Sequence, residues 1–308
     1  MSDPANSANK SVGLEVSNSA FKAVLLDAEG NIVSTSKVLT DRTQPLLEQL
    51  KSFINSLKEK FGNFEKIGVA VPGLVQRQTK RVAFSTYIPE HSEVDLLGEL
   101  AAATGLKITI ENDANAAAYG EFRLGAGRGS RNMFYATLGT GVGGAFIFDE
   151  KIWHGTSGFA GEFGYVAINS EGMKLEDVAS AQNIIRRTRS RFHQDSTTSL
   201  SQFEEEQISL KDIINEAEKE DDFAKMMLQR TGVYVGTAVA GVINLLNIER
   251  VVVGGEIMEA KHLVLEAIIE RAKELSFAPS FETVNIVEGE LGENAAAVGA
   301  ALLASENE

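Results

Sequence analysis

The pattern of hydrophobic and polar positions predicts short strands and amphipathic helices that follow one another in a regular order. In the first part of the chain, short apolar runs predict strands at 11–16, 21–26, 32–35, 66–71 and 107–110. Apolar residues spaced three and four positions apart predict helices at 46–57, 94–104 and 112–122. Asn112 and Asp113 are both residue types that cap helices, so either one is expected to cap the last of these.

The same order begins again near Met133. Strands are predicted at 133–138, 145–148, 251–253 and 284–287, and helices at 181–189, 211–217, 222–245, 260–275 and 295–304. The stretch 193–206, rich in Ser, Thr, Gln and Glu, is expected to be loosely ordered. Hairpins followed by alternating helices and strands predict mixed sheets covered by helices, in two similar halves. A cleft between such halves would be a natural site for a small molecule.

Composition and charge narrow the possible functions. The chain has 308 residues and a formal net charge of −14, which does not favour nucleic acid or an anionic membrane as a partner. It contains no cysteine, which excludes disulfides, thiolate metal sites and cysteine nucleophiles. The first ten residues contain no apolar segment typical of a secretory signal. The most apolar long stretch, 232–246, is shorter than the roughly 20 residues that span a bilayer. These features predict a cytoplasmic protein.

Four glycines fall within the segment 139–144, between two predicted strands. Their spacing satisfies the dinucleotide-binding pattern G-x-G-x-x-G, but that pattern must open a helix, and here a strand is predicted to follow. A glycine turn between strands instead presents backbone N–H groups that can hold an anion, and Thr140 adds a hydroxyl. Four glycines are more than a hairpin needs, which favours a phosphate loop over a plain hairpin. Gly254-Gly255 either lets a nucleotide approach the backbone or forms a simple strand-to-helix turn.

Several carboxylates stand where catalysis or sugar binding would need them. Asp113 follows a predicted strand, where it can accept a proton from a hydroxyl that attacks phosphorus, and Asn112 can hold an adjacent hydroxyl. The alternative is that Asp113 only caps the helix. Glu162 and Glu176 can accept the vicinal hydroxyls of a sugar, or can be surface charges near helix N-termini. The four histidines show no metal-ligand spacing, and the sequence contains no Walker motif.

Five segments match the motifs of a known family, in family order and from about residue 12 to residue 303. They are Val69-Ala-Val-Pro-Gly-Leu-Val75, Glu111-Asn-Asp-Ala-Asn-Ala-Ala117, Leu138-Gly-Thr-Gly-Val-Gly-Gly144, Gly158-Phe-Ala-Gly-Glu-Phe-Gly164 and Gly292-Glu-Asn-Ala-Ala-Ala-Val-Gly299. The sequence thus resembles the ROK family of repressors, open reading frames and sugar kinases. The resemblance implies an α/β protein with the actin-like ATPase (ribonuclease H-like, hexokinase) fold. Its two α/β domains, expected at 11–118 plus 291–308 and at 119–290, would flank a cleft.

The resemblance also implies an activity: ATP-dependent transfer of a phosphoryl group to a sugar hydroxyl, most simply that of glucose, by a homodimer. Asp113 matches the family's catalytic base, and Mg²⁺ would accompany ATP, near Glu15. The positions that match sugar-binding residues are Gly73, Asn112, Asp113, Glu162, Tyr165 and Glu176. The positions that match nucleotide-binding residues are Ser17, Asn18, Ser19, Gly139, Thr140, Gly141, Gly143, Gly254 and Gly255.

The sequence departs from the family pattern in three places. The first phosphate motif, usually Asp-x-Gly-Gly-Thr, reads Glu15-Val16-Ser17-Asn18-Ser19 and so lacks both glycines. Tyr165 stands where many members have a zinc-binding histidine, and the zinc cysteines are absent, so no zinc is expected. Tyr87 replaces an asparagine that touches the sugar, and His91 replaces a common tryptophan.

Three classes of function are compared. The leading hypothesis is an ATP:hexose phosphotransferase of the glucokinase type, with another hexose or an N-acetylhexosamine as the nearest alternative substrate. The altered first phosphate motif suggests a sugar sensor without catalysis, yet a sensor would need neither Asp113 nor the glycine loop. About ten residues precede the first predicted strand, which is too few for the helix-turn-helix of the family's repressors. A purely structural protein explains none of the motifs.

Overall fold

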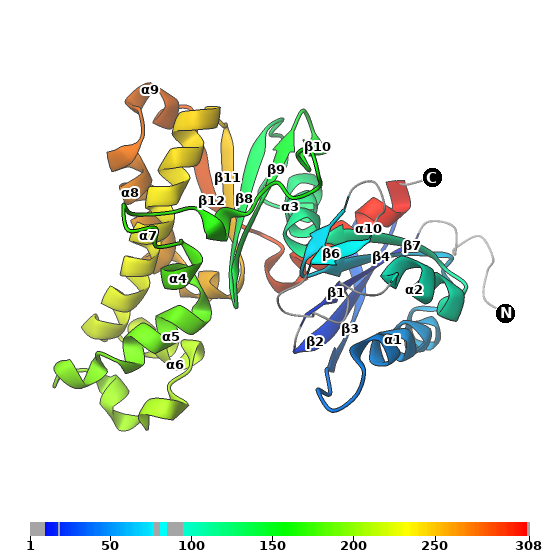
Figure 1. Ribbon diagram of the computed structural model, residues 1–308, viewed down its shortest axis with the longest axis horizontal. Coiled ribbons are helices and arrows are strands. Elements are labelled where there is room, and N and C mark those ends of the chain that lie inside the picture. Colours follow the sequence, from blue (N-terminus) through cyan, green and yellow to red (C-terminus); the bar gives the residue numbers. More distant parts are fainter. Residues whose placement is uncertain (1–9, 18, 77–80, 85–94, 307–308) are drawn as a thin grey trace. The chain divides into compact units, whose positions relative to one another are not determined.

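The computed structural model describes residues 10–17, 19–76, 81–84 and 95–306, which form two compact units (Figure 1). The first unit contains the chain up to Arg128, together with Lys151–Ala160 and the residues from Glu293 onward. The second unit contains Gly129–Glu150 and Gly161–Gly292. The expected domain boundaries, 11–118 plus 291–308 and 119–290, stay a prediction.

The first unit is built on a five-stranded mixed sheet with the strand order β3-β2-β1-β4-β7. Its strands are β1 (Ser11–Val16), β2 (Ala20–Leu26), β3 (Ile32–Leu39), β4 (Lys66–Val71) and β7 (Lys107–Asn112). The pairs β1–β2 and β2–β3 are antiparallel, whereas β4 runs parallel to both β1 and β7. A separate antiparallel pair consists of β5 (Leu74–Val75) and β6 (Val82–Phe84). The mixed sheet expected from the sequence pattern is thus confirmed.

Helices cover both faces of the first sheet. They are α1 (Leu46–Phe61), α2 (Leu96–Thr104), α3 (Asp113–Leu124) and α10 (Ala295–Glu306). Alternation along β1 separates the two faces, because successive side chains of a strand point to opposite sides. Val12 and Leu14 belong to the apolar core that α1 and α2 complete. Gly13 faces α10, where an added Cβ would lie 1.9 Å from the carbonyl oxygen of Ala297. A glycine at this position therefore lets α10 lie directly on the sheet.

The second unit repeats this arrangement. Its sheet has the order β10-β9-β8-β11-β12, in which β8 and β9 form an antiparallel hairpin and β11 runs parallel to both β8 and β12. The strands that belong to the second unit are β8 (Met133–Leu138), β9 (Val142–Phe148), β11 (Arg250–Gly254) and β12 (Asn285–Glu288), whereas the two-residue strand β10 (Lys151–Ile152) falls in the segment assigned to the first unit. The repeat that the sequence indicated, with copies starting near Val12 and Met133, is therefore present as two sheets of one strand order.

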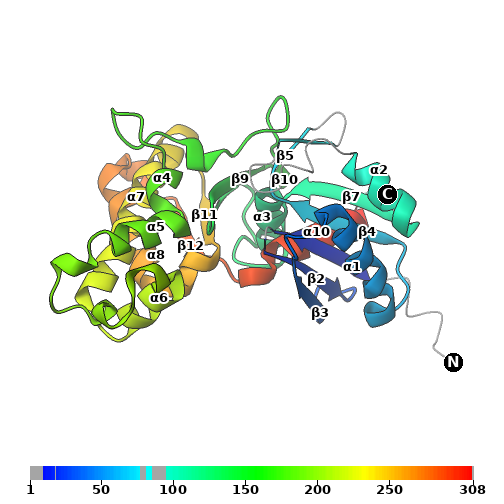
Figure 2. The same ribbon diagram turned by 60° about the horizontal axis from the view of Figure 1, so that its bottom comes forward.

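The helices of the second unit lie along one side of its sheet (Figures 1 and 2). They are α4 (Glu176–Ala179), α5 (Ala181–Arg189), α6 (Leu210–Glu218), α7 (Asp222–Leu246), α8 (His262–Leu275) and α9 (Ala278–Phe281). Two glycines let α7 and α8 pack closely: an added Cβ would lie 2.5 Å from the Val264 oxygen at Gly232 and 2.6 Å from the Ile268 oxygen at Gly236. None of the helices in the described residues combines the length and the apolar character needed to cross a membrane.

Short 3-10 helices occupy several segments for which the sequence predicted neither a strand nor, except at residue 260, a helix. They are Phe163–Tyr165, Phe192–Gln194, Ser199–Gln202, Glu205–Gln207, Glu256–Ala260 and Gly292–Asn294. The expectation of a loosely ordered stretch at 193–206 is wrong, because Asp221 orders its middle. The Asp221 carboxylate accepts hydrogen bonds from the Ser199 backbone at 2.6 Å and from the Thr198 hydroxyl at 3.0 Å. The helix expected from residue 260 begins at His262 instead, since Lys261 has a φ of 50° that interrupts it.

Candidate active site

The junction of β7 and α3 brings together Asn112, a predicted sugar-binding residue, and Asp113, the predicted catalytic base. Asn112 ends β7 and caps α3, because its side-chain oxygen accepts a hydrogen bond from the Asn115 backbone at 3.0 Å. Asp113 is the first residue of α3, and its Oδ1 accepts hydrogen bonds from the Ala114 backbone at 2.9 Å and from Asn112 Nδ2 at 3.0 Å. The cap position of α3 therefore belongs to Asn112 and not to Asp113. Its role as a catalytic base stays a prediction.

Gly73 joins the same junction from the turn between β4 and β5. Its carbonyl oxygen accepts a hydrogen bond from Asn112 Nδ2 at 3.0 Å. The residue has a φ of 145°, a conformation that favours glycine over other residues. The structure thus places three of the predicted sugar-binding residues, Gly73, Asn112 and Asp113, next to one another in the first unit.

Sequence analysis missed a buried carboxylate–histidine pair beside this junction. Glu111 is 9% exposed, and its Oε2 lies 2.9 Å from Nε2 of His154. Burial acts to raise the pKa of Glu111, but the hydrogen bond and charge of His154, with hydrogen bonds from Asn115 and Asn112, hold the pKa below its ordinary value. No spacing connects residues 111 and 154 in the sequence, so only the fold could reveal the pair.

The first phosphate motif forms a tight turn between β1 and β2. The Ser17 backbone donates to the Ala20 oxygen at 2.9 Å, and the Ser17 hydroxyl donates to the same oxygen at 2.8 Å. The Ser17 and Ser19 hydroxyl oxygens are 3.4 Å apart. Ser17 and Ala20 therefore close the connection between the two strands although serine stands where the family has its first glycine. Asn18, the third residue predicted here, lies outside the described residues, as do Tyr87 and His91.

Glu15 is paired with a lysine on the neighbouring strand. Lys22 Nζ lies 3.4 Å from Glu15 Oε2 and 3.2 Å from a carboxylate oxygen of Glu293. Burial raises the pKa of Glu15, and Lys22 offsets only part of that rise. Mg²⁺ in nucleotide sites is commonly held by one or two carboxylates, phosphates and water, so a single carboxylate suits it. The ammonium of Lys22 competes for that carboxylate, however, and Mg²⁺ near Glu15 stays a prediction.

The glycine-rich segment of the second unit forms a shorter turn than expected. Strand β9 already begins at Val142, so Gly143 pairs with Thr137 within the sheet instead of lying in a loop. The turn is closed by the Gly139 N–H, which donates to the Gly141 oxygen at 2.9 Å, and Gly139 O accepts from the Ala181 N–H at 2.8 Å. Gly144 is required by packing, since an added Cβ would lie 2.8 Å from that of Phe163. Only Gly139, Thr140 and Gly141 therefore remain outside the strands as a candidate phosphate turn.

Two predicted sugar-binding carboxylates lie near this turn within the second unit. Glu176 opens α4, and its Oε2 accepts a hydrogen bond from the Val142 backbone at 2.9 Å. Burial raises the pKa of Glu162, and the negative charge of Glu176 raises it further, which indicates that the two carboxylates are close. Tyr165 is 59% exposed, and Lys174 Nζ lies 3.9 Å from the centre of its ring.

Packing explains much of the second glycine pair. An added Cβ would lie 2.5 Å from the Tyr135 hydroxyl at Gly254 and 2.3 Å from the Leu138 oxygen at Gly255, which also has a φ of 96°. The pair therefore forms the strand-to-helix turn that the sequence left as an alternative, and its nucleotide role stays a prediction. The following residue, Glu256, lies beside the candidate phosphate turn, since a Cβ added at Gly139 would be 3.6 Å from its Oε1. Burial, followed by the charge of Glu259, raises the pKa of Glu256, and Thr140 offsets part of that rise. These contacts link Gly254-Gly255 to the candidate phosphate turn.

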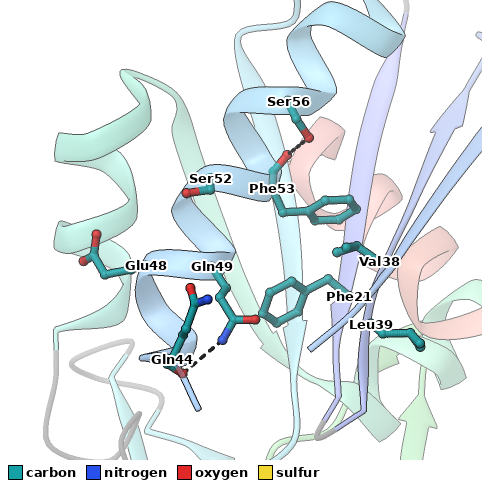
Figure 3. Close-up of a pocket in the computed structure, with 9 residues that line it drawn as sticks. All are labelled: Phe21, Val38, Leu39, Gln44, Glu48, Gln49, Ser52, Phe53 and Ser56. Carbon is teal, nitrogen blue, oxygen red and sulfur yellow. Dashed lines mark hydrogen bonds between the residues drawn. The ribbon is translucent and has the colours of Figure 1, made fainter. Parts of the chain in front are cut away.

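A shallow hollow elsewhere in the first unit does not belong to this set. It has a volume of about 390 Å³ and lies against α1 and the end of β3, with Phe21 and Phe53 at its base (Figure 3). Its polar groups are largely used internally: Gln49 Nε2 donates to the Gln44 oxygen at 3.0 Å, and Glu48 pairs with Lys51 at 2.9 Å. None of the predicted site residues lines it. The hollow therefore provides few groups for ligand recognition.

Comparison with known proteins defines first the fold and then the family. A ROK family glucokinase from Streptomyces griseus, solved in complex with glucose and AMPPNP, matches with a TM-score of 0.85 and 28% identity, over 97% of this chain and 100% of that one. The expected α/β class with the actin-like ATPase fold is thus confirmed. The model of the ROK family matches residues 11–307. The chain belongs to the ROK family, as its motifs indicated, and it lacks the zinc-binding cysteines of many members.

Curated relatives include both kinases and repressors. The glucokinase of Halalkalibacterium halodurans is 29% identical over 315 residues, covering 96% of this chain and 95% of that protein. The xylose repressor of Bacillus subtilis is 28% identical over 308 residues, covering 95% of this chain and 76% of the repressor. Similarity of this degree to both classes means that the activity must be inferred from the site.

Proposed function

We propose that this protein catalyses the ATP-dependent phosphorylation of a hexose hydroxyl, most simply the conversion of glucose to glucose 6-phosphate. The observation that carries the proposal is the β7–α3 junction, where Asn112 takes over the capping of the helix and Asp113 is left at its first position as a candidate base. Similarity to glucokinases over nearly the whole chain supports the same activity. Another hexose or an N-acetylhexosamine is the nearest alternative substrate.

In the proposed reaction, the sugar 6-hydroxyl attacks the γ-phosphorus of ATP. A bond forms between that oxygen and phosphorus, the bond from phosphorus to the β–γ bridging oxygen breaks, and Asp113 takes the hydroxyl proton. Asn112, Gly73, Glu162, Glu176 and Tyr165 are proposed to bind the sugar. When bound with ATP, Mg²⁺ would neutralise phosphate charge.

The proposed nucleotide contacts are made chiefly by backbone N–H groups that can bind phosphate. The N–H groups of Thr140 and Gly141 would face the phosphates, while that of Gly139 closes the turn. Ser17, Asn18 and Ser19 are proposed to contact phosphate as well. Gly143 and the pair Gly254-Gly255 would then act chiefly by permitting close packing behind the nucleotide. The Glu256 carboxylate lies beside Gly139 and would compete with a phosphate for the donors of this turn.

A sugar-responsive regulator without catalysis is the second candidate. It is favoured by the similarity to a xylose repressor and by the loss of both glycines from the first phosphate motif. A regulator would bind a sugar, yet it would have no use for Asp113 as a base. We also propose a homodimer in the cytoplasm, without a nucleic acid or membrane partner and without bound zinc.

An assay of ADP release across hexoses and N-acetylhexosamines tests the proposal. Purified protein with ATP and Mg²⁺ is expected to turn over at least one sugar, and that sugar identifies the substrate. Calorimetric titration with the same panel separates the two candidates. Sugar binding without any turnover would support the regulator and contradict the kinase.

A further inference from the structure

The Glu111–His154 pair lies beside the proposed catalytic residues, but the reaction outlined above makes no use of it. Both side chains are largely withdrawn from solvent: that of Glu111 is 11% exposed and that of His154 is 21% exposed. A second histidine–glutamate pair of the chain, His193 and Glu205, is 3.2 Å apart but has exposures of 67% and 45%. Removal of one partner from the buried pair would leave the other without compensation, whereas water solvates the partners of the exposed pair.

Glu111 connects three separate groups through its two oxygens. Oε1 accepts hydrogen bonds from the Asn112 backbone at 2.9 Å and from Asn115 Nδ2 at 3.0 Å, while Oε2 contacts His154 Nε2 at 2.9 Å. An ionised carboxylate can only accept hydrogen bonds, so Nε2 of His154 carries the proton that is donated. Through this one carboxylate, His154 is joined to the residues that begin α3.

The loop that contains His154 is itself closed. The His154 carbonyl oxygen accepts a hydrogen bond from the Ala160 backbone at 3.2 Å. Gly155 has a φ of 68°, and an added Cβ there would lie 3.2 Å from that of Ala160. Residues 151–160 belong to the first unit, and the chain then passes through Gly161 directly to Glu162. The loop that carries His154 is therefore fixed by its own hydrogen bond as well as by the contact with Glu111.

We propose that His154 is a positioning residue for sugar binding: its hydrogen bond to Glu111 holds the start of α3, where Asn112 and Asp113 stand. This inference rests on the proposed function. His154 touches neither the reacting atoms nor the sugar in this scheme. Its role is to keep Asn112 and Asp113 of the first unit aligned for the sugar, so its loss acts on sugar binding before it acts on chemistry.

A comparison of the KM for the sugar with the KM for ATP separates positioning from plain structural support. In His154→Ala, the sugar KM is expected to rise about tenfold, because displacement of aligned groups by a fraction of an ångström weakens their joint action, while the KM for ATP stays within about twofold. His154→Gln keeps an N–H at nearly the same reach and is expected to recover most of the sugar affinity. His193→Ala removes the exposed histidine of the same pair type and serves as the matched control, with unchanged kinetics.

The outcomes are distinguishable in one set of measurements. Equal sugar KM values for His154→Ala and the parent, or equal rises in the sugar and ATP KM values, would overturn the positioning role while leaving the kinase intact. If His154→Ala does not fold, as judged by circular dichroism, His154→Gln and Glu111→Gln decide the matter by the same KM ratio. A parent protein that neither binds nor phosphorylates any sugar would instead remove the proposed function, and this inference with it.

Discussion

Arg187 is a buried cation of the second unit with two nitrogen atoms that lack partners. Within the described residues, its Nε and Nη1 have no hydrogen-bond acceptor, and Nη2 alone donates, to the Thr231 hydroxyl at 2.8 Å. Burial lowers the pKa of Arg187 to about 10, and the charges of Arg230, Arg191 and Arg186 act in the same direction. Its guanidinium carbon lies 5.6 Å from the centre of the Tyr234 ring, which compensates only part of the lost hydration.

Replacing this cation by an apolar side chain of similar length is expected to stabilise the protein. Arg187→Met should raise the free energy of unfolding by about 1 kcal/mol. The desolvation penalty of buried N–H groups without acceptors exceeds the stabilisation that the arginine side chain gains from packing. Urea denaturation at neutral pH measures the change. Arg186→Met, on the exposed side of the same helix, is the control and should change stability by less than about 0.5 kcal/mol. A loss of stability in Arg187→Met would show that the guanidinium is satisfied after all.

The altered first phosphate motif gives a prediction about nucleotide binding. Glycines at positions 17 and 18 would bring the backbone closer to a phosphate, and aspartate at position 15 would shorten a side chain that now pairs with Lys22. The variant Glu15→Asp, Ser17→Gly, Asn18→Gly is therefore expected to lower the KM for ATP without changing sugar binding. Steady-state kinetics with ATP varied at saturating sugar measures it. An unchanged KM in an already efficient parent would show that this turn does not limit phosphate binding.

The roles of some single residues could not be predicted from the sequence. Asn112 and Asp113 are both good capping residues, so the pattern placed them at a helix start without deciding between them. The decision depends on side-chain geometry, in which Asn112 caps α3 and also reaches Gly73. His154 had no signal at all, since its partner Glu111 is distant in sequence and adjacent only in the fold.

Helix α7 contains a glycine that its close packing on α8 requires, Gly232, and one that this packing does not require, Gly241. An added Cβ at Gly232 would lie 2.5 Å from the Val264 oxygen and 2.7 Å from the Ala267 Cβ. At Gly241 it would meet nothing within 4 Å. The two positions therefore form a matched pair within α7.

Alanine at these two positions is expected to change stability in opposite directions. Gly232→Ala should lower the free energy of unfolding by about 2 kcal/mol, because α8 must move away. Gly241→Ala should raise it by roughly 0.5–1 kcal/mol, because alanine loses less backbone entropy in a helix. Thermal and urea unfolding measure both. Destabilisation of similar size at both positions would contradict close helix packing as the cause.

Among helices and strands, hydrophobic periodicity predicted those elements whose bounds are determined by the local sequence. Strands at 11–16, 66–71 and 133–138 were predicted with the bounds observed, because each is a short apolar run between polar or turn residues. The start of β9 was placed too late, since Gly143 and Gly144 look like loop residues although sheet packing requires at least Gly144 to be small. The 3-10 segments between 192 and 207 were missed because Asp221, which orders Ser199 and Thr198, lies outside the stretch.

For the whole molecule, the repeat visible in the sequence became two sheets with one strand order. The pattern could not show that Lys151–Ala160 belongs to the first unit, because that assignment depends on contacts such as Glu111–His154 that are distant in sequence. Most of the apolar face of α7 is buried in the core of the second unit. Met226, Val233 and Leu245 remain exposed on that helix.

The expected homodimer is tested by mass in solution. Multi-angle light scattering at micromolar concentration should give the mass of two chains. Charge substitutions at Met226 and Val233 would separate a dimer that uses the exposed side of α7 from one that forms elsewhere. A monomer mass for the parent across the working concentrations would contradict the homodimer and leave the proposed chemistry unaffected.

The most direct test of the central claim is the turnover of Asp113→Asn beside its sugar affinity. If Asp113 is the base for phosphoryl transfer, the variant keeps its fold and binds the sugar substrate within about threefold of the parent, while kcat falls by roughly 10²-fold or more. Calorimetry supplies the affinity, and ADP release supplies the rate, on one preparation of each protein. Near-normal turnover by Asp113→Asn, with sugar phosphate still formed, would contradict the account.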